Sequence, residues 1–322
     1  MIRLFPAAAL GVAALMIAGC ALPPAQGTAG AALPPLTAAR GTAPLRAEAK
    51  TDALLYVSDT ETSDVYVYTY PGGVLKQTLG GFIDPGGECV DAKGDVFVTN
   101  TGGLNIVEYA HGASTPAATL NDPGYFPFGC AVDPTTGNLA VTNFSTASGS
   151  GSGNVVIYEH AKGKPKKRYG DAAINGMLLC GYDDKGNLFV DGLTQASTTG
   201  FAELPKGGKK LIDIALDQNI VAAGGVQWDG KYVAVGDEAS DTIYRFSISG
   251  KKGTTAGVAA LSGGSAVVQF WIDGSKIVGP NSGLGSVGIW KYPAGGAPAK
   301  TIGGLYVPLG TVVSRAKGGE GV

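Results

Sequence analysis

A six-bladed β-propeller is the all-β fold that the sequence predicts, and three observations support it. First, a unit of apolar strand, Asp-containing turn and second apolar strand recurs as GECVDAKGDVFVTN (87–100), GCAVDPTTGNLAVTN (129–143) and GYDDKGNLFVD (181–191). Second, the second strands recur about every 41 to 49 residues, the length of one four-stranded propeller blade. Third, no stretch after residue 50 has the strong apolar period of a helix.

Six second strands can be counted along the chain. They are LLYVSD (54–59), DVFVTN (95–100), NLAVTN (138–143), NLFVDG (187–192), KYVAVG (231–236) and SKIVGP (275–280). Alternating apolar residues between clusters of Gly, Asp and Pro are typical of strands. Each unit continues with a third strand such as DVYVYTY (64–70) and a fourth such as VLKQTL (74–79). Four strands per unit and six units give six blades.

The two ends of the domain complete one blade between them. The domain begins with the second strand of a unit, and LGTVVSRAKG (309–318) at the other end has the pattern of the missing first strand. Such closure removes the exposed sheet edges of an open array. We therefore expect one propeller over residues 51–318 and a short tail over 319–322. A seven-bladed propeller and a β-sandwich fit the number of units less well.

The first fifty residues indicate export. Residues 1–20, MIRLFPAAALGVAALMIAGC, place Arg3 before an apolar run that is too short to span a membrane, as in a secretory signal peptide. Their end resembles a bacterial lipobox, which implies that Cys20 is acylated; Ala21 after it favours the outer membrane or cell surface. An ordinary signal peptide is the alternative. Residues 21–50, rich in Ala, Pro and Thr, are expected to form a disordered tether.

Two units resemble a known repeat. FIDPGGECVDAKGDVFVTN (82–100) and YFPFGCAVDPTTGNLAVTN (125–143) are similar to repeats of the NHL family, with its aromatic, Pro, Gly, Val-Asp and terminal Asn or Asp. Propellers of this kind include lactone hydrolases, lyases, sensor domains and interaction platforms, so the resemblance alone selects no function.

Related six-bladed lactonases imply a possible metal site. They hold a divalent cation at the channel mouth, and the comparable positions here make Glu88, Asn100 and Asn143 candidate ligands for Ca²⁺ or a similar ion. Asp59, Asp191 and Asp237 fall at places comparable to the two Asn. The structural alternative is that these Asp and Asn side chains close strand ends by bonding to the backbone.

The remaining residue types argue against other chemistry. Cys89, Cys130 and Cys180 are an odd number, so no complete disulfide framework is expected, and Cys130 and Cys180, at equivalent repeat positions, are predicted to be small buried thiols. His111 and His160 fall in turns between third and fourth strands, which disfavours a Ser-His-Asp or zinc centre. A net charge of −2 disfavours nucleic acid as a partner.

Two surfaces are candidates for binding. One face should gather loops 144–154, 191–200 and 280–286 with the aromatic segment 121–129, where Tyr125, Phe126 and Phe128 suit stacking on sugar or peptide. Packing between blades is the alternative for Phe82, Tyr125 and Tyr306. The opposite face should gather the basic turns 160–168, 206–210 and 250–253, where Lys164, Lys166, Lys167 and Arg168 suit an anionic polymer or lipid head groups. Solvated lysines are the alternative there.

The leading hypothesis is a non-enzymatic, lipid-anchored, monomeric propeller that binds an envelope protein or glycan and needs no cofactor. It rests on the lipobox, the tether and the loop-rich face, together with the lack of a recognisable catalytic set. One alternative is a metal-dependent, lactonase-like hydrolase that uses the central channel. The other is a structural envelope protein without a specific ligand.

Overall fold

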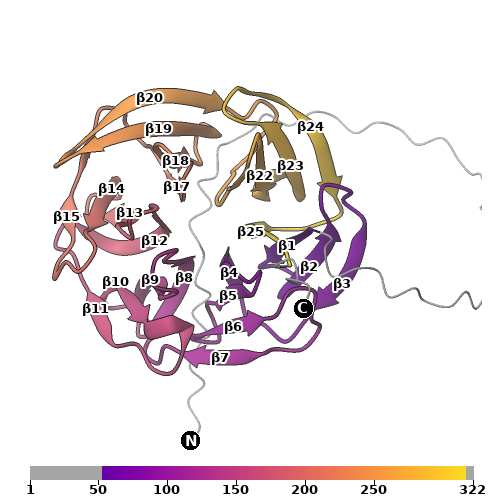
Figure 1. Ribbon diagram of the computed structural model, residues 1–322, viewed down its shortest axis with the longest axis horizontal. Helices are drawn as coiled ribbons and strands as arrows, with labels where there is room; N and C mark the ends of the chain where they lie inside the picture. The colour runs from indigo at the N-terminus through magenta and orange to yellow at the C-terminus, as the bar shows by residue number, and fades with distance from the viewer. Residues whose placement is uncertain (1–52, 317–322) are drawn as a thin grey trace, which may run out of the picture. The chain divides into compact units, whose positions relative to one another are not determined.

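Six β-sheets stand around a central axis in the computed structural model, which describes residues 53–316 (Figure 1). The predicted six-bladed propeller is therefore confirmed. The predicted signal peptide 1–20, the acylated Cys20, the tether 21–50 and the tail 319–322 lie outside the described residues. The described part of the chain holds no helix with the length and hydropathy of a membrane span.

Each blade runs from its first strand near the axis to its fourth strand at the rim. Blade 1 is β25 (Pro308–Ser314), β1 (Leu54–Asp59), β2 (Asp64–Thr69) and β3 (Leu75–Leu79); blade 2 is β4 (Pro85–Val90), β5 (Val96–Asn100), β6 (Asn105–Tyr109) and β7 (Ala118–Asn121). Blade 3 is β8 (Tyr125–Val132), β9 (Leu139–Thr146), β10 (Ser152–Tyr158) and β11 (Lys167–Tyr169). Blade 4 is β12 (Ile174–Tyr182), β13 (Leu188–Thr194), β14 (Thr199–Leu204) and β15 (Ile212–Asp213).

The last two blades follow the same plan with one addition. Blade 5 is β17 (Ala223–Trp228), β18 (Val233–Asp237), β19 (Thr242–Ser249) and β20 (Lys252–Ala260), with the short β16 (Ala215–Leu216) added in parallel outside β20. Blade 6 is β21 (Trp271–Asp273), β22 (Lys276–Asn281), β23 (Ser286–Lys291) and β24 (Gly295–Gly303). Two 3₁₀ turns, η1 (Glu159–Ala161) and η2 (Ser282–Leu284), lie in connections.

The ring closes as the sequence predicts. The C-terminal strand β25 pairs antiparallel with β1, with Leu54 opposite Ser314 and Tyr56 opposite Val312 (Figure 1). The first blade thus takes its inner strand from one end of the described chain and its other strands from the opposite end. Because the ring is closed, every inner strand has a neighbouring blade on each side, and its backbone N–H and C=O groups are shielded from water.

Apolar layers between adjacent blades form the core. The layer between blades 1 and 2 contains Tyr56 and Val98, whereas the layer between blades 2 and 3 contains Cys89 and Phe97. Successive residues of a strand point to opposite sides of the sheet, so neighbours in sequence enter different layers. This alternation decides which of the two neighbouring apolar layers each side chain enters.

Hydroxyl side chains at one position of the second strands join blades 1, 2 and 3 each to the next blade. Thr99 donates a hydrogen bond to the Phe128 carbonyl at 2.8 Å, and Thr142 donates to the Leu178 carbonyl at 2.5 Å. Asp191 occupies this position in blade 4, where its Oδ1 accepts from the Leu179 amide at 2.9 Å. Its Oδ2 has no hydrogen-bond partner among the described residues. Burial raises the pKa of Asp191 well above its ordinary value, which favours the neutral acid.

The next position of the second strands fastens loops. Asp59 accepts from the Tyr306 amide at 2.7 Å, Asn100 from the Ile83 amide at 2.6 Å, and Asp237 from the Ala222 amide at 3.0 Å. Each amide belongs to the connector that leads into the inner strand of the same blade. The structural interpretation of these Asp and Asn residues is confirmed. The expectation that Asp191 is comparable to them is wrong, because it lies one position earlier in its strand.

Candidate functional site

The central channel is filled by apolar side chains at one level. Leu309 of blade 1, Leu179 of blade 4 and Val268 of the connector into blade 6 form a buried cluster, with Leu178 and Phe128 packed against it. Blades 1 and 4 stand opposite each other in the ring, so the cluster crosses the axis. The predicted binding residue Phe128 is therefore part of this plug and is partly buried.

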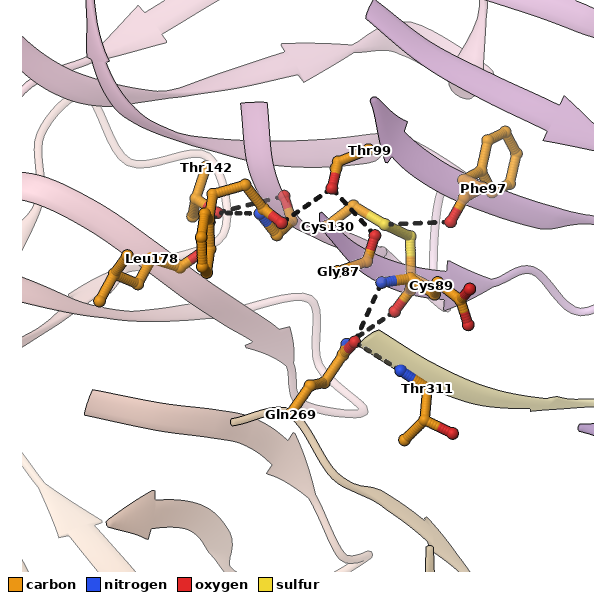
Figure 2. The surroundings of a disulfide bond; sticks show 12 residues. Gly87, Cys89, Phe97, Thr99, Cys130, Thr142, Leu178, Gln269 and Thr311 are labelled. Atoms are coloured by element: carbon orange, nitrogen blue, oxygen red, sulfur yellow. Dashed lines mark hydrogen bonds between the residues drawn. A yellow bond between two sulfur atoms is a disulfide. The ribbon is translucent and has the colours of Figure 1, made fainter. Parts of the chain in front are cut away.

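Beside the plug, the amide side chain of Gln269 makes hydrogen bonds to backbone groups of two inner strands. Gln269 donates from Nε2 to the Glu88 carbonyl at 2.7 Å, and its Oε1 accepts from the amides of Glu88 and Thr311, each at 3.0 Å (Figure 2). It thereby joins blade 6 to the inner strands of blades 1 and 2. The backbone groups that it binds are satisfied within the protein and are not available to a ligand.

Glu88 itself lies in an apolar layer. It is fully buried, and it stands opposite Val98 in the sheet, so both side chains face the layer between blades 1 and 2. Neither carboxyl oxygen has a hydrogen-bond partner among the described residues. Burial raises the pKa of Glu88 well above its ordinary value of 4.5. An apolar layer that favours the neutral acid is a poor site for a hard cation.

The hydrogen bonds of the three candidate metal ligands do not bring them together. Asn100 bonds to Ile83 and Asn105, and Asn143 donates to Asp122 and Asn154 at 2.8 and 3.1 Å. No hydrogen bond joins any two of Glu88, Asn100 and Asn143 within residues 53–316. Nor do three or more His, Cys, Asp or Glu side chains gather as a metal-binding group in that range.

Cys89 and Cys130 form a disulfide between blades 2 and 3 (Figure 2). The prediction of a free thiol was wrong for Cys130 and is confirmed for Cys180, which is buried and unbonded. Cys89 lies two residues before the turn residue Asp91, whereas Cys130 lies three before Asp133. Because they differ by one position, the two side chains point to opposite sides of their sheets and face each other across the layer between blades 2 and 3. Cys180 has the alternation of Cys130 and packs in a layer with Ala131, which holds no second thiol.

The topology separates the connections into two faces. The loop face holds the loops between second and third strands and the connectors between blades; the turn face holds the other turns. The segments of the loop face are 60–63, 80–84, 101–104, 122–124, 147–151, 170–173, 195–198, 218–222, 238–241, 261–270, 282–285 and 304–307. Every charged residue in them is acidic: Glu61, Asp84, Asp122, Asp171, Glu238 and Asp241. The pKa of Glu238 is raised by burial and by neighbouring Asp241 and Asp237.

Large apolar side chains stand exposed on the loop face. Leu284 and Tyr306 are 60% and 66% exposed, and Val307 is also exposed; we call these three the loop-face patch. Their segments touch, because Leu305 donates to the Gly285 carbonyl at 3.1 Å. Ile83 is exposed one blade further on. Packing between blades is confirmed for Phe82, which is buried against Tyr109, and is wrong for Tyr306.

Two predicted binding residues from different surfaces meet each other. Arg168 forms an ion pair with the buried Asp122, and its guanidinium lies 4.4 Å from the centre of the Tyr125 ring. Arg168 therefore does not belong with the lysines of the basic turns, where the sequence placed it. Tyr125 is covered by Arg168, and Phe126 beside it is partly buried. Lys164, Lys166 and Lys167 are exposed.

The two histidines lie where the sequence predicts. His111 is in the turn between β6 and β7, where its Nδ1 lies 2.7 Å from the Ser314 hydroxyl. His160 is in η1, and its Nδ1 lies 3.0 Å from the Thr136 carbonyl oxygen. Both turns belong to the turn face.

Comparison with known proteins identifies the fold. No family model matches the chain, and no curated protein matches it. Among solved structures 1234 chains match. One comes from the "Crystal structure of Nidogen/Laminin Complex", with a TM-score of 0.66 and 12% identity over 82% of this chain and 99% of that chain. At this identity the likeness shows the propeller fold alone.

Proposed function

We propose that this protein is an exported, lipid-anchored binding module whose loop face binds another protein of the cell envelope. The observation that carries the proposal is the loop-face patch, a set of exposed Leu, Tyr and Val side chains on a face whose connecting segments carry only acidic charged residues. Exposed apolar groups with a polar surround are typical of protein interfaces. A protein partner is favoured over a glycan because Leu284 and Val307 offer neither stacking nor hydrogen bonds to sugars.

The acidic surround indicates the charge of the partner. Glu61 and Asp84 lie in the loop-face segments next to the patch in blades 1 and 2, and no Lys or Arg lies in any described segment of that face. A complementary partner surface carries Lys or Arg around an apolar centre.

The disulfide supports the export part of the proposal. A buried Cys89–Cys130 bond forms and persists in an oxidising compartment such as the periplasm or the cell surface. Acylation of Cys20 would anchor the chain, and residues 21–50 would then act as a tether of roughly 30 Å. Ala21 favours the outer membrane or cell surface as the location.

Replacing Leu284 and Tyr306 together by serine should weaken partner capture about tenfold or more, because anchors near the centre of an interface dominate its free energy. Residues 21–322 are immobilised on a resin and incubated with an envelope extract of the native host. Mass spectrometry then quantifies the proteins that they capture. The matched control replaces Val74 and Leu75, which are 63% and 51% exposed at the end of blade 1 on the turn face. Equal loss in both variants, or unchanged capture by the first, would place the binding site elsewhere.

The effect of metal ions on thermal stability distinguishes the binding module from the alternative, a metal-dependent hydrolase. We expect about 1 mM Ca²⁺, Mg²⁺, Mn²⁺ or Zn²⁺ to leave the melting temperature within about 1 °C of its value in chelator, because Glu88 lies in an apolar layer and no metal-binding group of His, Cys, Asp or Glu is found among residues 53–316. A cation at 100 times its dissociation constant adds about 2.7 kcal/mol, which raises the melting temperature by roughly 5–10 °C. A rise of that size that Glu88→Gln removes would favour the hydrolase.

A further inference from the structure

The described chain begins and ends on the turn face. β1 runs from Ala53 to the loop 60–63 on the loop face, so its first residue is at the opposite, turn face. β25 is antiparallel to β1 and ends at Ser314 beside Leu54. The residues that precede Ala53 are therefore joined to the propeller at the turn face.

The turn face carries the lysines that the loop face lacks. Exposed lysines occupy the turns between third and fourth strands of blades 3, 4 and 5, namely Lys162, Lys164, Lys166, Lys206, Lys209, Lys210 and Lys251. Further exposed lysines, Lys93, Lys185 and Lys231, occupy turns between first and second strands. Among the described residues, therefore, the segments of the loop face carry only acidic charged side chains, whereas the turns of the turn face also carry many exposed lysines.

Acidic groups of the turn face are mostly engaged close by. Asp133 binds Thr135 and Thr136, Asp183 binds Lys185 and Asn187 through its turn, and Asp229 pairs with Arg245 at 2.7 Å. Glu159 lies 3.9 Å from Lys166, and Asp91 and Asp95 lie 3.6 and 3.8 Å from Lys93. Asp184 is exposed. The turns that hold Lys164, Lys209 and Lys210 retain a positive excess.

We infer that the turn face docks on an anionic lipid bilayer and that the loop face points away from it. A negative membrane surface attracts clustered lysines and repels carboxylates, so the two faces favour one orientation. The inference rests on the proposed lipid anchor at Cys20 for its biological setting. The anchor would supply the first attachment and the lysines the second, the combination that gives stable membrane binding. The loop-face patch would then remain open to a partner.

Vesicle binding of residues 21–322, which lack the proposed acylation site, tests the surface independently of the anchor. At about 20 mM salt we expect co-sedimentation with vesicles of phosphatidylglycerol and phosphatidylcholine but not with pure phosphatidylcholine, and loss of binding at about 500 mM salt. The variant Lys164→Gln/Lys209→Gln/Lys210→Gln should bind roughly 100-fold more weakly, at about fivefold per lysine.

The matched control changes net charge equally on the other face. Gln195→Glu, Ala172→Glu and Asn219→Asp add three negative charges at exposed loop-face positions. This variant should bind within about threefold of the unaltered protein. Equal weakening of both variants, or no binding to anionic vesicles at low salt, would overturn the inference. Failure of Cys20→Ser to release the full chain from membranes would instead contradict the anchor, and unchanged partner capture by the patch variant would contradict the proposed function.

Discussion

Replacement of both Cys89 and Cys130 by alanine is expected to lower the free energy of unfolding by about 4 kcal/mol. The disulfide joins residues 41 apart in sequence, and opening this loop returns conformational entropy to the unfolded chain. For a domain of this size the loss corresponds to a fall in melting temperature of roughly 10 °C or more. Thermal unfolding under non-reducing conditions measures it.

Cys180→Ala is the matched control for this experiment. Cys180 is a buried inner-strand cysteine at the position equivalent to Cys130, but it is unbonded. Its replacement removes one sulfur from the core and should cost about 1 kcal/mol. A double variant no less stable than Cys180→Ala would show that the bond between Cys89 and Cys130 contributes nothing to the folded state.

Glu88→Gln is expected to make the protein more stable at neutral pH and to flatten its pH dependence. The carboxyl of the unfolded chain ionises near 4.5, whereas burial raises the pKa of Glu88 in the folded protein well above that value. As pH rises between the two values, the unfolded chain releases a proton that the folded protein keeps. Stability therefore falls by up to about 1.4 kcal/mol per pH unit above pH 4.5, and glutamine removes this loss.

Urea unfolding at pH 5, 6, 7 and 8 measures the effect. The exposed Glu61→Gln variant is the control, and it should follow the pH profile of the unaltered protein. Asp191 is also buried with a raised pKa, so part of the slope should persist in Glu88→Gln and disappear only when Asp191→Asn is added. Parallel profiles for Glu88→Gln and the unaltered protein would contradict the apolar surroundings assigned to Glu88.

Local pattern was enough to predict the blades. Strands such as β1 and β5 combine alternating apolar residues with flanking Gly and Asp, and these signals act within a few residues. Ring closure by residues 309–318 followed from the same pattern, because an incomplete first unit needs its missing strand. The loop-closing roles of Asn100 and Asp237 were also predictable, since Asp and Asn bond to nearby backbone wherever strands end.

The pairing of Cys89 with Cys130 depends on the side of its strand to which each thiol points. Cys89 and Cys130 differ by one position within the unit, and in a strand one position reverses the side to which a residue points. Opposite sides of adjacent blades are what bring two thiols together. Cys130 and Cys180 share a position in the unit and therefore cannot face each other across one layer.

The order of the blades, their number and the closed ring follow from the sequence alone, because each rests on short-range alternation and on turn residues. The tertiary structure alone decided which residues meet across blades: the burial of Glu88 between blades 1 and 2, the ion pair that removes Arg168 from the lysine turns, and the plug around Leu179. These contacts join residues far apart in the chain. Their geometry depends on blade twist and spacing, which no local pattern encodes.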